Sequence, residues 1–205
     1  MTVVQASPEA RLRDVTFELD RREVFPQLVG DHRDFLIVSG LAGASKDVAA
    51  LTSDGPNAFT MAGAMGAAVS MGLGLALAQP DRPVLVVTGE GELLMNVGAL
   101  ATVAVMDPGN LAIVCIDNGH YGETGYQRTH TSFCTDLDVI ATGSGIRRTV
   151  VVEDESNLAE GAAALRDLSC SSFVLLRVKE TEPAAARRNL HAHECRTRFR
   201  QLLDS

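Results

Sequence analysis

The chain has 205 residues, of which 46% are apolar, and this is enough to build one well-buried core. The formal net charge of −8 argues against a nucleic-acid partner and a membrane-surface role, although local backbone dipoles still allow an anionic ligand. The four cysteines are widely spaced and form no C-x-x-C pair. Their spacing disfavours a zinc ribbon, an iron–sulfur cluster and a disulfide framework.

The N-terminal segment MTVVQASPEARLRD lacks the apolar stretch of a secretory signal. Residues 58–80 carry no charge and are long enough for a membrane span. Alanine and glycine dominate this stretch, however, and small residues fit a close-packed internal helix better. We therefore expect a cytoplasmic protein that does not cross a membrane.

The first half of the chain alternates between helical and strand patterns. Residues 7–30 have the periodicity of an amphipathic helix, with Val15, Leu19, Val24 and Leu28 on its buried side. The elements predicted after it are a strand over 34–39 that ends at 40–43, a Gly- and Ala-rich helix over 61–79, a strand ending at Thr88, a helix that begins near Glu92, and a strand over 111–116.

The second half continues the alternation after a glycine-containing loop over 119–131. Its predicted elements are a helix over 136–142, a strand over 149–152, a helix over 157–168, a strand over 173–178 and a polar helix over 184–203. Apolar strands without period-two alternation, separated by helices, indicate an α/β fold: a parallel sheet with helices on both faces. The expected domains are an N-terminal helical extension over 1–30, an α/β domain over 31–183 and a C-terminal helix over 184–205.

Polar residues follow two of the predicted strands, at the edge of the sheet where such folds bind ligands. Gly89-Glu90-Gly91 ends one strand and opens a helix, whose free N–H groups and dipole favour a phosphate. Asp117-Asn118-Gly119 ends the other. Carboxylate and amide oxygens there suit Mg²⁺, which also takes ligands from phosphates. Spacing alone leaves open a plainer interpretation, in which Glu90 caps a helix and Asn118-Gly119 is an ordinary turn.

The segment GEGELLMNVGALATVAVMDPGNLAIVCIDN resembles the thiamine diphosphate signature, a G-D-G followed after about 25–30 residues by an asparagine. The preceding block AGAMGAAVSMGLGLALAQPDRPVLVVTGEG and the segment YGETGYQ extend the resemblance over residues 34–180. The chain is most similar to the pyrophosphate-binding subunit or domain of sulfopyruvate and phosphonopyruvate decarboxylases. This resemblance implies the thiamine diphosphate-binding fold of that domain over residues 31–183.

The resemblance also implies a cofactor site. Glu90 stands where the family has its metal-binding Asp, Asn118 where it has the Asn ligand, and the carbonyl of His120 would be the third magnesium ligand. Met65 matches the apolar residue that holds the cofactor bent. The remaining residues that would bind the cofactor are Gly63, through its carbonyl, together with Gly89, Gly91, Glu92, Tyr121 and Gly122.

Two residues depart from the family pattern. Glu90 replaces Asp and adds a methylene between the backbone and the metal, and Mg²⁺ tolerates little distortion. Glu92 adds a carboxylate beside a site meant for a diphosphate, where it would either point away or weaken binding. These departures bring the cofactor affinity into question.

The resemblance further implies that the chain forms half of an enzyme. The family supplies the glutamate that activates the cofactor from a separate pyrimidine-binding domain, which a chain of this length cannot also contain. We expect a pyrimidine-binding α subunit as partner, in an α₂β₂ or larger assembly, and decarboxylation of a small 2-oxo acid. Within this chain Glu123 and His130 are candidates for proton transfer, and Arg128 with His130 for contact with a substrate anion, although all three could be solvated loop residues.

Three alternatives to a decarboxylase subunit stay open at this point. The chain could be a β subunit of a 2-oxoacid oxidoreductase or a fragment of an acetolactate-synthase-like enzyme. It could be a non-catalytic nucleotide-binding or regulatory domain, although GEGELL lacks the last glycine of a dinucleotide fingerprint. Glu90 and Glu92 also allow a degenerate, inactive relative of the thiamine enzymes.

Overall fold

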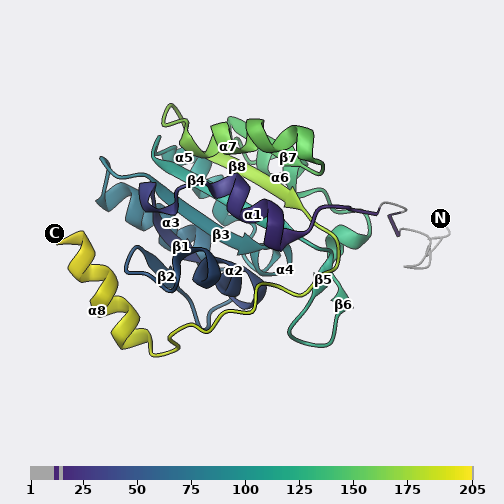
Figure 1. Cartoon of the computed structure of the whole chain (residues 1–205). Coiled ribbons are helices and arrows are strands. Elements are labelled where there is room, and N and C mark those ends of the chain that lie inside the picture. The colour runs from purple at the N-terminus through teal and green to yellow at the C-terminus, as the bar shows by residue number, and fades with distance from the viewer. Residues whose placement is uncertain (1–11, 14–15, 205) are drawn as a thin grey trace, which may run out of the picture.

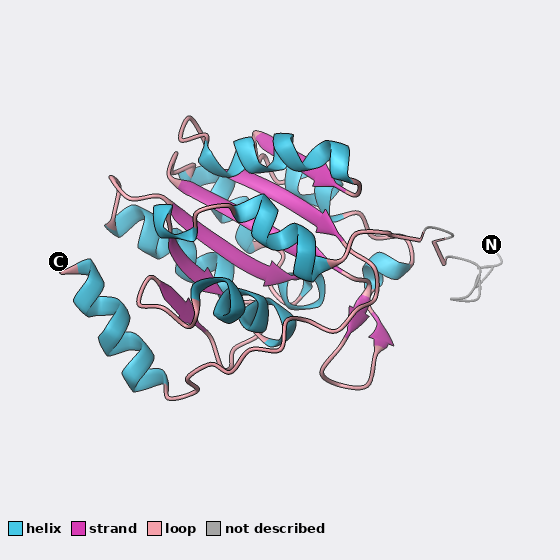
Figure 2. Ribbon diagram, in the orientation of Figure 1, coloured by secondary structure: helices cyan, strands magenta, loops and turns pink. Residues whose placement is uncertain are grey.

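The computed structural model of the chain describes residues 12–13 and 16–204. Its centre is a six-stranded parallel sheet with the order β2-β1-β3-β4-β8-β7 (Figures 1 and 2). A short antiparallel hairpin of β5 and β6 follows β4. The strands are β1 Leu36–Ser39, β2 Ala58–Thr60, β3 Val84–Gly89, β4 Leu111–Asp117, β5 His120–Tyr121, β6 Gln127–Arg128, β7 Arg148–Val152 and β8 Ser172–Arg177.

Helices cover both faces of this sheet, which confirms the predicted α/β class (Figure 2). One face packs against α1 Arg21–Val29, α2 Ala42–Thr52 and α7 Leu158–Arg166. The other packs against α3 Ala68–Ala78, α4 Glu90–Leu94, α5 Ala99–Met106 and α6 Leu137–Gly143. The C-terminal helix α8 Ala192–Leu203 lies beside β2, and short 3₁₀ turns occupy His32–Asp34, His130–Ser132 and Glu155–Asn157.

The central strands are apolar throughout because both of their faces are buried. In β3, Leu85 and Val87 belong to the core under α1, α2 and α7, whereas Val84 and Val86 belong to the core under α3 and α5. All four side chains are fully buried. This two-sided burial is the reason for the missing period-two alternation in the sequence.

The helix predicted over residues 7–30 is wrong in its extent. Within the described residues it begins only at Arg21, because the side chain of Asp20 accepts a hydrogen bond from Arg22 N and caps the helix there. Residues 16–20 are not helical. The part of the prediction that falls on residues 7–11 and 14–15, including Val15, lies outside the described residues.

The helix predicted over 61–79 begins seven residues late, at Ala68. Residues 61–67 form a loop in which Ala64 and Gly66 have positive φ angles of 66° and 85°, which an α-helix does not allow. Two elements before it, α2 and β2, were not predicted. The single helix predicted from Glu92 is divided into α4 and α5, and residues 184–191 of the last predicted helix are not helical.

No helix among residues 12–13 and 16–204 is long and apolar enough to span a membrane. The Gly- and Ala-rich helix α3 instead packs against the sheet, where Val69 and Leu73 belong to the core. All four cysteines are free thiols, and three of them are buried.

Candidate functional site

A pocket lies at the carboxyl edge of the sheet, where the connections from β1 and β3 diverge. The chain leaves β1 through α2 on one face, and it leaves β3 through α4 and α5 on the opposite face. Between two such strands an open α/β sheet has a crevice, and ligands bind there. The pocket is lined by residues from the loop after β1, the end of β3 and the segment after β4.

Most of the predicted cofactor-binding residues line this pocket. They are Met65, Gly89, Glu90, Gly91, Glu92, Asn118, His120, Tyr121 and Gly122, together with the proton-transfer candidate Glu123. Gly63 is exposed and is not part of this lining, so its predicted contact with the cofactor has no support from the pocket. His130 is exposed and also lies outside the lining, whereas Arg128 lines a neighbouring pocket.

Glu90 is the first residue of α4 and is only 3% exposed. Its Oε1 accepts a hydrogen bond of 3.0 Å from Thr129 Oγ1. The hydroxyl of Thr129 lies 3.0 Å from that of Thr131, which donates to Asp117 Oδ1 at 2.7 Å. Two threonines therefore connect the two buried carboxylates. Burial and the charge of Asp117 raise the pKa of Glu90, and burial also raises that of Asp117.

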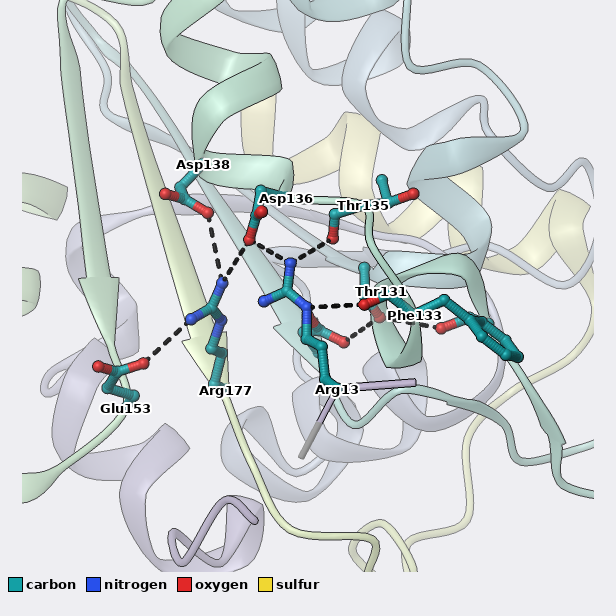
Figure 3. Close-up of polar contacts among 10 residues, drawn as sticks. Arg13, Thr131, Phe133, Thr135, Asp136, Asp138, Glu153 and Arg177 are labelled. Carbon is teal, nitrogen blue, oxygen red and sulfur yellow. Dashed lines mark hydrogen bonds and ion pairs between the residues drawn. The ribbon is translucent and has the colours of Figure 1, made fainter. Parts of the chain in front are cut away.

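Two arginines hold the segment that carries these threonines. Arg13 and Arg177 meet at Asp136, beside Thr131 (Figure 3). Arg13 also donates to two backbone carbonyls of the segment, and Arg177 donates to two further carboxylates. These acceptors are Phe133 O, Thr135 O, Asp138 Oδ1 and Glu153 Oε2. The positions of Thr129 and Thr131 thus depend on contacts far along the chain.

Asn118 and His120 form a tight turn directly after β4. The amide oxygen of Asn118 accepts from His120 N at 3.1 Å, and its carbonyl lies 2.9 Å from His120 Nδ1. Because a carbonyl only accepts, this ring nitrogen carries the proton. The turn holds both residues at the pocket, next to the strand end that carries Glu90.

Glu92 turns its carboxylate back into the protein. Its Oε2 accepts from Leu41 N at 2.9 Å and from Thr88 Oγ1 at 3.1 Å, and the residue is 5% exposed. Burial raises its pKa. The carboxylate therefore links the ends of β1 and β3. Of the two orientations expected from the sequence, this is the one that points away from an incoming diphosphate.

Gly91 lies against the ring of Tyr121 as well as in the lining of the pocket. A Cβ atom at this position would lie 2.4 Å from a ring carbon of Tyr121. The glycine therefore makes room for the Tyr121 ring, in addition to any ligand. At the outer part of the pocket, Glu123 pairs with Lys46 at 3.1 Å, and Tyr126 donates to Glu182 at 2.8 Å. Glu123 is thus partnered rather than free.

The donors around the pocket fit a magnesium ion bound together with a diphosphate. Within the described residues no group of three or more His, Cys, Asp or Glu side chains is arranged to hold a metal on its own. The candidate donors are one buried carboxylate, one amide oxygen and one carbonyl, which suits a hard cation that takes its other ligands from a phosphate.

Comparison with known proteins now bears on this site. Residues 42–178 match the family described as "Thiamine pyrophosphate enzyme, C-terminal TPP binding domain". The chain belongs to this family. The matched span contains most of the sheet and the ends of β3 and β4, which carry Glu90 and Asn118. The resemblance to thiamine diphosphate enzymes and the predicted fold are confirmed.

The relatives differ in how much of their own length matches this chain. The chain is 39% identical over 147 residues to sulfopyruvate decarboxylase subunit beta of Methanocaldococcus jannaschii, covering 72% of this chain and 77% of that protein. It is 37% identical over 167 residues to phosphonopyruvate decarboxylase of Streptomyces hygroscopicus, covering 81% of this chain but only 41% of that protein. The structure of benzoylformate decarboxylase from Polynucleobacter necessarius shares the fold, with a TM-score of 0.63 at 17% identity and with 81% of this chain and 34% of that chain covered.

Several residues of the pocket were not predicted from the sequence. Arg21, the loop from Leu41 to Ala44 and Lys46 line the pocket, and Thr129 hydrogen-bonds Glu90. The two glycines at 40 and 43 were the one local signal of a turn at the end of β1. Arg21 and Thr129 carry no local signal, because they reach the site from 26 and 39 residues away from their partners.

Proposed function

We propose that the chain is the diphosphate-binding subunit of a thiamine diphosphate- and Mg²⁺-dependent decarboxylase. Its substrate would be a small 2-oxo acid of the sulfopyruvate or phosphonopyruvate kind. The observation that carries the proposal is the position of Glu90 and Asn118 at adjacent strand ends on one pocket, in a chain of this family. The relatives that support the substrate class are decarboxylases of these two acids.

In this proposal the chain binds and orients the cofactor. Glu90, Asn118 and the carbonyl of His120 would hold the magnesium ion against the diphosphate, while Gly89 and Gly91 would let the backbone approach it. Met65, which is 45% exposed and lies in the loop before α3, would support the thiazolium ring. The cofactor supplies the carbanion-stabilising centre for decarboxylation, and the protein supplies position and electrostatics.

A pyrimidine-binding α subunit would complete the site. The chain spans less than half of the Streptomyces relative, which leaves room in that protein for a second domain of similar size. Several large apolar side chains are also exposed in the loop before α3, in α3, after α4 and in α5, and burial of such groups would favour association with a partner. They are Met65, Met71, Met95, Val105 and Met106. We infer a hetero-oligomer of α₂β₂ or larger composition.

The assay compares the purified chain with the chain co-expressed with its partner. Both are supplied with thiamine diphosphate, Mg²⁺ and sulfopyruvate, phosphonopyruvate or pyruvate. We expect turnover only from the assembled complex, because in this proposal the α subunit supplies the glutamate that activates the cofactor. Sustained turnover by the chain alone would disprove the split site, and a complex that binds the cofactor without decarboxylating any of the acids would disprove the reaction.

An oxidoreductase or carboligase subunit is less well supported. The sequence relatives named here are decarboxylases. The similarity to a 2-oxoglutarate:ferredoxin oxidoreductase is 19% in sequence, which concerns the fold alone.

A further inference from the structure

Arg21 is a buried cation on the wall of the pocket. It is the first residue of α1 and only 6% exposed, yet it lines the pocket together with Glu90 and Tyr126. Its Nε and Nη2 donate to Asp47 Oδ2 at 2.8 and 2.5 Å, and Asp47 Oδ1 accepts from Ala184 N at 3.0 Å. One edge of the guanidinium is therefore anchored, whereas Nη1 donates a hydrogen bond to no described residue.

Gly43 leaves the space that the Arg21 guanidinium occupies. A Cβ atom on Gly43 would lie 2.7 Å from Arg21 Nη2 and 2.9 Å from Nη1, so a side chain there would displace the anchored group. Gly43 belongs to the first turn of α2, and no side chain caps the start of that helix. The positive end of the α2 dipole and the arginine therefore face the same space. A cation beside a helix N-terminus is unfavourable unless an anion lies between them.

Arg21 is the buried cation of the pocket, and its counter-ion Asp47 lies outside the lining. The lining contains four glutamates, at positions 90, 92, 123 and 182, and two cationic side chains, Arg21 and Lys46. Lys46 is paired with Glu123. The positive charge of Arg21 reaches the outer wall of the pocket, since it opposes the rise in the pKa of Tyr126 that Glu182 causes. An anionic ligand would need this charge to enter a pocket with so many carboxylates.

We propose that Arg21 is an anion-binding residue of this pocket, anchored by Asp47, and that its Nη1 donates to an oxygen of a phosphate, phosphonate or sulfonate group. Two sources have this chemistry: the diphosphate of the cofactor and the acidic head group of the substrate. The inference deepens the proposed function, because it assigns a recognition residue to the same site. Its plain alternative is an ion pair that only joins α1, α2 and the segment at Ala184.

The test separates binding from folding by removing the buried pair as a unit. Arg21→Met alone would leave Asp47 buried without a partner and destabilise the chain, so the main variant is Arg21→Met/Asp47→Asn, which removes both charges. Gly43→Ala is the second variant, since it keeps the arginine but moves its head group. Arg22→Met is the matched control, because Arg22 is the neighbouring, largely exposed arginine that pairs with Asp20.

Calorimetry uses two probes on the full chain, inorganic diphosphate with Mg²⁺ and sulfoacetate. We expect both test variants to bind one of the two probes at least tenfold more weakly than the parent. A decrease of this size corresponds to the loss of one hydrogen bond between charged groups. A loss for diphosphate assigns Arg21 to the cofactor end of the ligand, and a loss for sulfoacetate assigns it to the substrate head group. The melting temperature of each variant is measured beside the titration, and the Arg22→Met control should bind as the parent does.

Unchanged binding of both probes by the double variant and by Gly43→Ala overturns the proposal, as does a parent chain that binds neither probe. The proposed function can fail separately. If the parent binds diphosphate through Arg21 but the assembled complex decarboxylates no 2-oxo acid, the anion site stands and the decarboxylase assignment does not. If Glu90→Ala abolishes cofactor binding while the Arg21 variants bind both probes normally, the proposed cofactor site stands and the anion-binding role of Arg21 does not.

Discussion

Replacement of Glu90 by glutamine should lower cofactor affinity and raise the stability of the metal-free chain. Glu90 is the only charged ligand among the three proposed for magnesium, and it is almost fully buried. Glutamine keeps the oxygen that accepts from Thr129, so the loss is that of the charge alone. We expect binding of thiamine diphosphate with Mg²⁺ to weaken by about 2–3 kcal/mol, or roughly 30- to 150-fold.

The opposite effect on stability follows from Asp117. Burial and the charge of Asp117 raise the pKa of Glu90 to about 8, so the metal-free chain must protonate this carboxyl when it folds at neutral pH, and glutamine removes that cost. We expect the free energy of unfolding of the metal-free chain to rise by on the order of 1 kcal/mol. Glu90→Asp should be tolerated for cofactor binding, because it restores the usual family ligand, although it shortens the reach to Thr129.

The assay pairs calorimetry of the assembled complex with denaturant unfolding of the metal-free chain. Glu160→Gln is the matched control, since Glu160 is an exposed carboxylate in the first turn of α7. It tests what a carboxylate contributes merely by standing at the start of a helix, which is about 0.3–1 kcal/mol. If Glu90→Gln binds the cofactor as tightly as the parent, Glu90 is only a helix-start carboxylate and the metal assignment is wrong.

Three further substitutions test the surroundings of the site. Thr129→Val should lower the free energy of unfolding by about 1–2 kcal/mol and weaken cofactor binding severalfold, because Glu90 loses its hydrogen-bond donor. Thr129→Ser should restore both, and normal stability of the valine variant would contradict the hydrogen-bond chain. Glu92→Ala should destabilise the chain by about 1–3 kcal/mol because Leu41 N and Thr88 Oγ1 lose their acceptor, whereas Glu92→Gln keeps an acceptor oxygen. Improved cofactor binding by the alanine variant without loss of stability would refute this orientation of Glu92. Gly91→Ala should displace the Tyr121 ring and lower the free energy of unfolding by about 1–3 kcal/mol, measured by heat or denaturant. Gly98→Ala is the control, because no atom lies near its Cβ. Equal stability of the two variants would show that the Tyr121 ring can move without cost.

The positions of the strands along the chain could be predicted from the sequence wherever both faces of a strand are buried. The strands β3 and β4 were predicted within one residue of their bounds, because a fully buried strand is a continuous apolar run. The regions around α2 and β2 were missed. There the apolar residues are small or few, and β2 has only three residues, so neither period stands out.

The loop over residues 61–67 shows how tertiary contacts override a local preference. Its alanines and methionines favour a helix when considered alone, whereas its two glycines do not. Asn96, which lies 30 residues further on, donates to Gly66 O and holds the backbone in a turn with positive φ angles. The orientation of Glu92 has a similar cause, since its partner Leu41 N lies 51 residues away.

The sequence by itself determined the α/β class, the two polar strand ends and the family, since these are encoded in short runs of neighbouring residues. Only the tertiary structure decided which way Glu92 points, that Thr129 and Thr131 connect Glu90 to Asp117, and that Arg21 enters the pocket. These contacts join residues that are distant along the chain and adjacent only after the parallel strands have paired. The physical reason is that a strand end fixes where a side chain begins, while the segments packed around it fix where its charge is placed.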